Sequence, residues 1–393
     1  MRVFFLQDRL KALGGGAARR FEHVHVVGAG LMGGDIAAWC AYRGLTVTLQ
    51  DREERFVAAA QERARGFFDR KCRRPGQAEA CQARLTADVE GAGAAAADVV
   101  IEAIFEDAEA KRTLYRRLEP VMKPGALLAT NTSSLMLEEL ARDLADPSRL
   151  VGLHFFNPVQ KMMLVEIVRG AATSDVAAQD AAAFARRLDR LPLPCRSAPG
   201  FAVNRVLMPY MTEAMHAHAE GVPLAAIDQA AMDFGMPMGP VELADTVGLD
   251  VALHVGRILA AASGREPPQG LEPLVAAGQL GRKSGRGLYE WRDGKPVKPP
   301  AGPAPADLQD RLVLQYLNEA VACLREGVVA DPDLLDAGMI FGTGFAPFRG
   351  GPLHYARQRG VDAVVRRLEE LERAHGPRFR PDPGWDALRG PSP

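Results

Sequence analysis

The stretch from His23 to Asp51, HVHVVGAGLMGGDIAAWCAYRGLTVTLQD, predicts a strand, a glycine turn, a helix and a second strand that ends on an acid. Gly28, Gly30 and Gly33 follow the first strand in the spacing G-x-G-x-x-G. The first glycine allows a tight turn, the second lets backbone N–H groups approach a pyrophosphate, and the third lets the helix pack closely on the strand. The stretch therefore predicts a dinucleotide-binding site.

The residues beside this turn indicate which dinucleotide binds. Leu31 and Met32 open the helix, whose positive N-terminal end faces the phosphates, and we include both in the cofactor site. Asp51 follows the last glycine at about the 20-residue spacing where a carboxylate hydrogen-bonds the adenosine ribose. A carboxylate there repels a 2′-phosphate, so NAD is favoured over NADP. The alternative is a structural turn that binds no ligand in a doubly wound sheet.

Composition bounds the class of protein. A chain of 393 residues is too long for one core, so two or three domains are expected. A net charge of −1 gives no bulk attraction to nucleic acid or membrane, and no apolar run is long enough to span a bilayer. The short apolar run Val3–Leu6 is not a signal peptide. Five cysteines without metal-type spacing predict idle thiols in a reducing cytoplasm and no metal.

Strands and helices alternate through the first half of the chain, which predicts a doubly wound α/β sheet in a domain of residues 21–197. Polar residues gather just past the strand ends, where such sheets bind ligands. After the opening stretch we expect strands at 98–103, 127–130, 150–156, 164–168 and 191–195.

A helical unit occurs twice in the second half. Tyr210, Glu213, Ala214, Glu220 and Gly221 recur with constant spacing as Tyr316, Glu319, Ala320, Glu326 and Gly327. We interpret this as a tandem duplication of one helical domain, in residues 198–295 and 308–393, joined by a Pro-rich linker at 296–307. The alternative is a chance similarity of two helical hairpins.

Residues 1–20 predict a short helix, 3–13, followed by a glycine-containing linker. Two interpretations stay open. The linker is a remnant of a join to a preceding segment, or the N-terminus is simply frayed.

One histidine and one glutamate form the candidate catalytic pair. His154 stands near the end of an apolar strand, and histidine exchanges protons near neutral pH. Glu166 lies inside the apolar strand LVEIV, where an ionised carboxylate is costly unless it is paired. A carboxylate on one ring nitrogen would fix the tautomer and stabilise the imidazolium. The alternatives are a structural histidine and a glutamate on an edge strand facing water.

Seven motifs in one order carry a family resemblance: VGAGLMGGDIA, EAIFEDAEAK, NTSS, GLHFFNP, LVEIVRG, PGFAVNR and FGMPMGP. Together they resemble the 3-hydroxyacyl-CoA dehydrogenases. The second helical copy, FGTGFAPFRGGPLHY, is similar to the α-subunits of multifunctional fatty-acid oxidation enzymes. Those carry an enoyl-CoA hydratase half before the dehydrogenase half, and this chain has no room for one, so hydratase activity is expected to be absent.

The resemblance implies a Rossmann-type sheet followed by two tandem all-α domains, and NAD-dependent oxidation of (S)-3-hydroxyacyl-CoA in β-oxidation. His154 is then the base and Glu166 its partner. Ser133 and Asn204 are implied to hold the substrate oxygen, in a cleft between domains, with a turn serine and a helix cap as the alternatives. The remaining implied contacts are Glu106, Lys111, Asn131, Ser133, Asn157 and Lys283 for the nucleotide, and Tyr355 of the second copy for the substrate. The alternatives are a turn cap for Asn157 and a solvated pair on a helix for Glu106 and Lys111.

The same residues leave three rival functions open, and they also predict how the chain assembles. The rivals are a 3-hydroxybutyryl-CoA dehydrogenase working reductively, another hydroxy-acid dehydrogenase with a lysine base, and a non-catalytic NAD-binding protein. The His154–Glu166 pair argues against the last two. Because simple family members pair through the helical domain, two copies in one chain predict a monomer with an internal pseudo-dimer, the alternative being a homodimer. A thiolase or a separate hydratase is a candidate partner.

Overall fold

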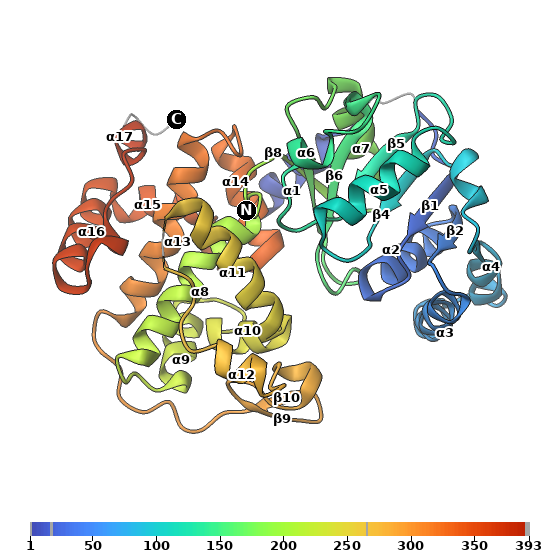
Figure 1. Ribbon diagram of the computed structural model, residues 1–393. Coiled ribbons are helices and arrows are strands. Elements are labelled where there is room, and N and C mark those ends of the chain that lie inside the picture. Colours follow the sequence, from blue (N-terminus) through green and yellow to red (C-terminus); the bar gives the residue numbers. More distant parts are fainter. Residues whose placement is uncertain (1, 16–18, 265, 390–393) are drawn as a thin grey trace. The chain divides into compact units, whose positions relative to one another are not determined.

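The structure is a computed structural model that describes residues 2–15, 19–264 and 266–389. It divides into a sheet unit, Gln7–Ser197, and a helical unit, Met1–Leu6 with Ala198–Pro393. Each unit is described by itself (Figure 1). The first helix, α1 (Arg2–Ala12), agrees with the prediction, whereas residues 16–18 of the predicted linker lie outside the described residues.

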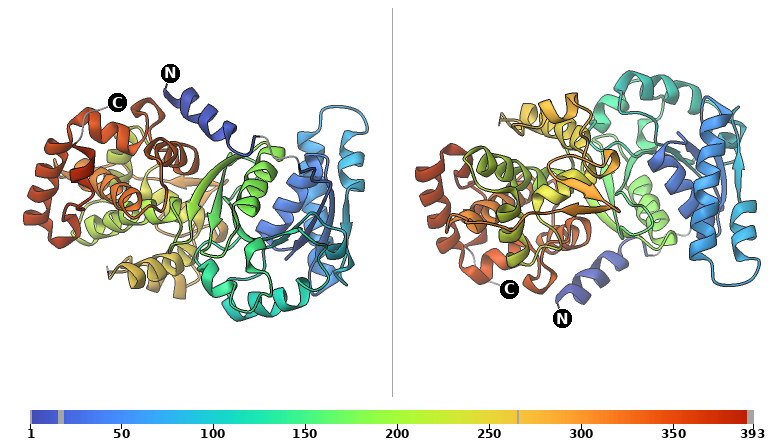
Figure 2. Two further views of the ribbon diagram at one scale, coloured as in Figure 1. Left: turned by 90° about the horizontal axis from the view of Figure 1, so that it is seen from above. Right: turned by 90° about the horizontal axis from the view of Figure 1, so that it is seen from below.

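The sheet unit alternates strands and helices as predicted, and helices cover both faces of its sheet (Figures 1 and 2). The predicted glycine stretch is β1 (His23–Val27), α2 (Leu31–Tyr42) and β2 (Thr46–Gln50). The remaining elements are α3 (Glu54–Lys71), α4 (Gln77–Ala83), β3 (Leu85–Ala87), η1 (Ala92–Ala95), β4 (Val99–Glu102), α5 (Ala108–Leu118), β5 (Leu127–Thr130), α6 (Leu137–Leu140), η2 (Pro147–Arg149), β6 (Leu150–Phe155), β7 (Leu164–Arg169), α7 (Asp175–Arg187) and β8 (Leu191–Arg196).

The strand order is β3-β2-β1-β4-β5-β6-β7-β8, so the winding reverses between β1 and β4. Ligands bind at this reversal point in doubly wound sheets. All neighbouring strands are parallel except β6 and β7, which pair antiparallel. The segment 156–163 between them is too short for the crossover that a parallel pair needs. The antiparallel register sets His154 directly opposite Glu166.

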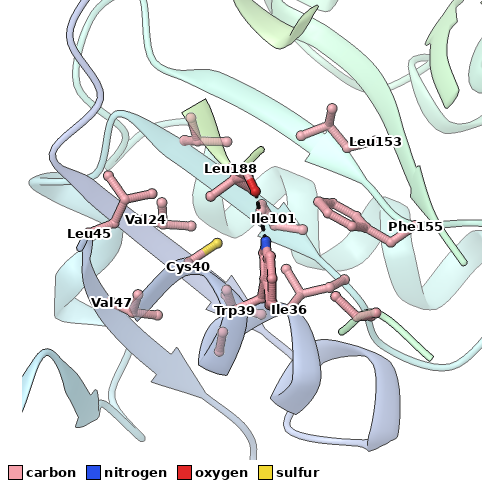
Figure 3. Packing of buried hydrophobic residues seen from close by; sticks show 14 of the residues in the cluster. Val24, Ile36, Trp39, Cys40, Leu45, Val47, Ile101, Leu153, Phe155 and Leu188 are labelled. Atoms are coloured by element: carbon pink, nitrogen blue, oxygen red, sulfur yellow. Dashed lines mark hydrogen bonds between the residues drawn. The ribbon is translucent and has the colours of Figure 1, made fainter. Parts of the chain in front are cut away.

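One core beneath the sheet fixes the glycine turn in place. It packs α2, α3 and α7 against the strands, and Figure 3 shows Trp39 at its centre. The Trp39 ring N–H donates to the Leu188 carbonyl at 2.9 Å, and the Arg190 guanidinium lies over the ring. Because Trp39 belongs to α2, this packing holds the helix whose first turn follows Gly28 and Gly30 and contains Gly33.

The helical unit contains the two predicted helical segments. It also contains one small hairpin, which the sequence analysis did not predict. The hairpin, β9 (Glu290–Arg292) with β10 (Lys295–Val297), is antiparallel. Among the described helices, none combines the length and apolarity that a bilayer-spanning segment needs. The helices are α8 (Val203–Ala219), α9 (Leu224–Phe234), α10 (Pro240–Val247), α11 (Leu249–Ser263), α12 (Glu272–Ala276), η3 (Arg282–Ser284), α13 (Leu308–Arg325), α14 (Pro332–Thr343), η4 (Pro347–Arg349), α15 (Pro352–Arg359), α16 (Val361–His375), η5 (Pro377–Phe379) and α17 (Trp385–Leu388).

The two repeats meet through α8 and α13, which are equivalent in the predicted duplication. Arg205 of α8 binds Glu319 and Glu326, both at 2.7 Å. Arg311 of α13, which has the spacing of Arg205, binds the two equivalent acids in return, Glu213 at 2.6 Å and Glu220 at 2.7 Å. The equivalent tyrosines of the two helices also contact each other. Reciprocal contacts of this kind are those of a two-fold interface.

Each repeat also contains a buried aspartate whose carboxylate contacts the first turn of the helix that begins at a Gly–Pro pair. Asp228 accepts from the Val241 backbone N–H, and Asp336 accepts from that of Leu353. Their remaining partners differ. Lys298, in the segment that directly follows the first repeat, lies 2.8 Å from Asp228, whereas the cation at 2.9 Å from Asp336 is Arg2, which is far from it in the sequence.

The pH dependence of stability should report on Asp336. Burial raises the pKa of Asp336 to about 7, although the Leu353 N–H and Arg2 act to lower it. Because this folded-state pKa lies above that of an unfolded aspartate, Asp336 favours the folded state most below the unfolded value, and this contribution is lost as the pH rises through about 7. The advantage of wild type over Asp336→Asn in free energy of unfolding should therefore increase as the pH falls from about 8 to about 5.

Urea denaturation at both pH values measures this difference. Asp333→Asn is the matched control, because Asp333 binds the same arginine at 2.6 Å but is partly exposed. A difference for Asp336→Asn that does not change with pH would contradict the assignment.

Candidate active site

The glycine turn has the shape that a dinucleotide requires. Gly28 has a φ of +107°, and a Cβ there would lie 2.4 Å from the Ala103 carbonyl oxygen. A Cβ on Gly33 would lie 1.8 Å from the Gly28 oxygen, so close packing excludes side chains at both positions. A Cβ on Gly30 would meet nothing within 4 Å, and no side chain caps α2. Open space before an uncapped helix N-terminus fits a pyrophosphate.

Asp51 stands where the cofactor motif predicts, but its carboxylate also supports the turn. Its Oδ2 accepts from the Ala29 backbone N–H at 2.7 Å. The sequence analysis missed Arg63 of α3, whose guanidinium donates to the carbonyls of Ala29 and Gly30 at 3.3 and 3.0 Å. These contacts hold the turn from two sides. Leu31 is exposed and Met32 half-buried at the first turn of α2.

Replacing Gly33 by alanine should weaken NADH binding by at least about 10-fold, because the new methyl group displaces the Gly28 carbonyl and with it the turn. Fluorescence titration of NADH measures the dissociation constant. Gly66→Ala is the control, since a Cβ there meets only the flexible end of Arg70 at 3.3 Å. Unchanged NADH affinity in Gly33→Ala would contradict the role of the turn.

His154 and Glu166 form a buried hydrogen-bonded pair. Nδ1 of His154 lies 2.6 Å from Oε2 of Glu166, and the two side chains are 6% and 0% exposed. The antiparallel register of β6 and β7 places them opposite each other, and Phe156 packs beside the imidazole with ring centroids 4.5 Å apart. Since Glu166 binds Nδ1, proton exchange with a substrate would run through Nε2.

Glu106 organises the turn that contains Ser133. Its Oε1 accepts from the Thr132 hydroxyl at 2.5 Å and from the backbone N–H groups of Ser133 and Ser134 at 3.0 and 3.2 Å. Burial acts to raise the pKa of Glu106, but Lys111 and these donors outweigh it and lower the pKa. Within the described chain, no hydrogen bond involves the Ser133 hydroxyl, which suits a group that binds substrate.

Asn131 joins the same turn to the strand of His154. Its side-chain oxygen accepts from the Phe155 backbone N–H at 2.9 Å. The sequence analysis assigned Asn131 to the cofactor, and this contact shows that it also connects β5 to β6. Asn157 follows β6, is exposed, and precedes Pro158 in a cis peptide bond.

Lys111 is buried between two glutamates, and its predicted contact to the nucleotide stays a prediction. It is 1% exposed, and its ammonium lies 2.6 Å from Glu102 and 3.3 Å from Glu106. Glu102, at the end of β4, is a buried acid that the sequence analysis did not single out. A glutamate ending an apolar strand was the signal that could have identified it.

Three predicted site residues belong to the helical unit. Asn204 is half-buried in the first turn of α8. Lys283 pairs with Asp250 at 2.6 Å on an exposed surface, and Tyr355 packs edge-on against Phe234 with ring centroids 5.1 Å apart. Their roles toward nucleotide and substrate stay predictions. Among the described residues, no group of three or more His, Cys, Asp or Glu side chains could hold a metal ion.

A doubly wound sheet with this glycine turn and terminal acid is the NAD-binding fold of an oxidoreductase. The family models agree: residues 23–198 match the 3-hydroxyacyl-CoA dehydrogenase NAD-binding domain, and residues 200–291 match the C-terminal domain of the same enzymes. The chain belongs to the 3-hydroxyacyl-CoA dehydrogenase family.

Relatives and solved structures give the same result. The chain is 34% identical to the fatty acid oxidation complex subunit alpha of Shewanella sp. strain MR-7 over 97% of its own length, and spans 58% of that relative. It resembles the 3-hydroxybutyryl-CoA dehydrogenase of Escherichia coli K12 at 28% identity and a TM-score of 0.85, covering 94% of this chain and 98% of that one. It also resembles the (S)-3-hydroxybutyryl-CoA dehydrogenase of Ralstonia eutropha at 34% identity and a TM-score of 0.65. That similarity covers 70% of this chain and 100% of that one.

Proposed function

We propose that this chain catalyses the NAD-dependent oxidation of (S)-3-hydroxyacyl-CoA to 3-oxoacyl-CoA in fatty-acid β-oxidation. The buried His154–Glu166 pair is the observation that supports this most directly, because it joins a base and its orienting acid in a dehydrogenase fold. The fatty acid oxidation complex α-subunits, to which the chain is similar over 97% of its length, support the substrate class.

Each residue of the proposed site has a separate role in the reaction. His154 takes the proton of the 3-hydroxyl at Nε2, while Glu166 holds Nδ1 and stabilises the imidazolium that results. Ser133 and Asn204 bind the substrate oxygen and orient it toward His154. Bound NAD⁺ supplies the acceptor for the hydride that leaves C3.

Acetoacetyl-CoA-dependent oxidation of NADH, followed by absorbance, tests this function in the reverse direction. We expect saturable turnover with NADH and weaker use of NADPH, because Asp51 opposes a 2′-phosphate. A chain that binds NADH but does not turn over acetoacetyl-CoA or longer 3-oxoacyl-CoA would overturn the proposal.

A second candidate is a 3-hydroxybutyryl-CoA dehydrogenase that works in the reductive direction. The similarity to the Escherichia coli enzyme of that name, which covers 98% of that enzyme's chain, favours it. The ratio of kcat/KM for four-carbon and longer substrates, measured in both directions, distinguishes the two candidates.

The assembly is a monomer whose two repeats pair with each other. The reciprocal pairs Arg205–Glu319 and Arg311–Glu213 support this, since each repeat already meets the surface that a second subunit would offer. We expect one chain per particle in sedimentation velocity. A homodimer that buries residues 199–295 against a second chain would contradict this prediction.

The relatives' names describe a complex, which supports a thiolase or a separate hydratase as a partner. We place the enzyme in the cytoplasm, where its five cysteines, none of which is in a disulfide, would stay reduced. Co-purification with a thiolase expressed alongside it tests the partner.

A further inference from the structure

Two cysteines of the sheet unit lie close enough to react with each other. Sγ of Cys72 lies 3.9 Å from Sγ of Cys81, and both are free thiols. Cys72 directly follows the last residue of α3 and is partly exposed, whereas Cys81 belongs to α4 and is 1% exposed. A disulfide joins sulfurs about 2.05 Å apart, so a movement of roughly 2 Å brings this pair to bonding distance.

The chain at Cys72 is free to make this movement. Its φ of −74° and ψ of 136° are extended rather than helical, and the four residues that follow, 73–76, are all exposed. A Cβ on Gly76 would meet no atom within 4 Å, so nothing packs on the end of this loop. Cys81, in contrast, is part of the same buried core as Phe68. Closure therefore moves Cys72 toward a fixed Cys81.

We propose that Cys72 and Cys81 form a reversible disulfide, which links the end of α3 to α4 under oxidising conditions. The bond joins the two ends of the segment 72–81 and removes its open conformations. Since α4 leads directly into β3, the outermost strand of the sheet, this edge of the sheet becomes more ordered when the bond forms. The inference does not depend on the proposed function.

The oxidant is a small-molecule disulfide such as oxidised glutathione. The Cys72 thiolate, which is the accessible one, attacks one sulfur of this disulfide, whose S–S bond breaks and releases one small thiolate. The Cys81 thiolate then attacks the Cys72 sulfur of the mixed disulfide, and the second small thiolate leaves. The two protein thiols lose two electrons and two protons, and the small disulfide takes up both to become two thiols.

The reaction should be slow at neutral pH. Burial and the hydrogen-bond partner Cys81 raise the pKa of Cys72 to about 11, and the carboxylates of Asp69 and Glu79 act in the same direction. Because the thiolate is the attacking species, little of Cys72 is reactive until the pH rises. The pair therefore stays reduced where thiols are in excess and closes when small disulfides accumulate.

The test incubates the full chain, above neutral pH, in glutathione buffers with an increasing ratio of oxidised to reduced form. By mass spectrometry we expect the loss of two hydrogen atoms and the tryptic peptide 72–73 bonded to the peptide 74–84. Hydrogen exchange of the amides at 77–87 should slow by about 10-fold or more. Dithiothreitol should reverse both changes.

Three variants locate the effect. Cys72→Ser and Cys81→Ala should each abolish the bonded peptides and the slower exchange. Cys323→Ala is the matched control, because it removes a buried thiol from α13 of the helical unit, and it should behave as wild type. If Cys81→Ala does not fold, Cys72→Ser carries the test, since that side chain is partly exposed.

Four results would overturn the proposal. They are a stable glutathione adduct on Cys72, a disulfide that joins two chains, an intramolecular disulfide that still forms in Cys72→Ser, and unchanged exchange at 77–87 in the oxidised protein. The first two would show that Cys81 cannot reach Cys72, the third that other cysteines react, and the last that the bond does not order the edge of the sheet.

Discussion

Replacing His154 by alanine is expected to lower kcat for acetoacetyl-CoA reduction by about 10²- to 10⁴-fold, the usual contribution of a general acid–base group. In this direction the imidazolium donates the proton that the 3-hydroxyl gains. The side chain is buried and bound to Glu166 at 2.6 Å, so its loss removes the proton donor of the proposed reaction together with its contact to the orienting acid. NADH should bind as in wild type, because the glycine turn is unaffected.

Stopped-flow absorbance measures the rate, and fluorescence titration measures NADH binding. His218→Ala is the matched control, since His218 is exposed and hydrogen-bonds the Val222 carbonyl in the helical unit. Turnover of His154→Ala within a few-fold of wild type would remove this residue from catalysis.

Replacing Glu166 by glutamine should lower kcat by about 10²-fold or more, and loss of the orienting acid in a Ser–His–Asp triad costs about 10⁴-fold. The amide is nearly isosteric, but it carries no charge to stabilise the imidazolium and can face the ring with its NH₂ group. The antiparallel register of β6 and β7 leaves the pair no alternative alignment. NADH affinity should again be unchanged.

The free energy of unfolding of Glu166→Gln must be measured together with its kcat, because removing one partner of a buried charged pair can cost about 3–5 kcal/mol. The assay therefore runs at a temperature where circular dichroism shows the variant folded. Glu79→Gln on the exposed face of α4 is the control. A folded Glu166→Gln enzyme with wild-type kcat would show that the acid has no part in the reaction.

Local patterns explain which parts of the fold were predictable. The glycine spacing from Gly28 to Gly33 requires particular backbone geometry, and the structure has it. The apolar strands are short and continuous, so their positions agreed with the structure to within one or two residues. The duplication was readable because each copy keeps its own tyrosine and glutamates.

Other parts depend on contacts that spacing does not encode. The segment between α3 and β4 contains α4 and β3, neither of which the sequence analysis predicted. The direction of β7 depended on the length of the preceding loop. Arg63 and Glu102 act through neighbours distant in sequence, so only the structure brings them to the site.

The contact between Arg2 and Asp336 has a consequence for how this protein can evolve. The buried Asp228 of the first repeat pairs with Lys298, from the segment that directly follows this repeat. The buried Asp336 of the second repeat pairs instead with Arg2, which is far from it in the sequence. Recombination that moved residues 308–393 alone would carry the Asp336 carboxylate away from Arg2, so this pair couples two segments that lie 334 positions apart in the sequence.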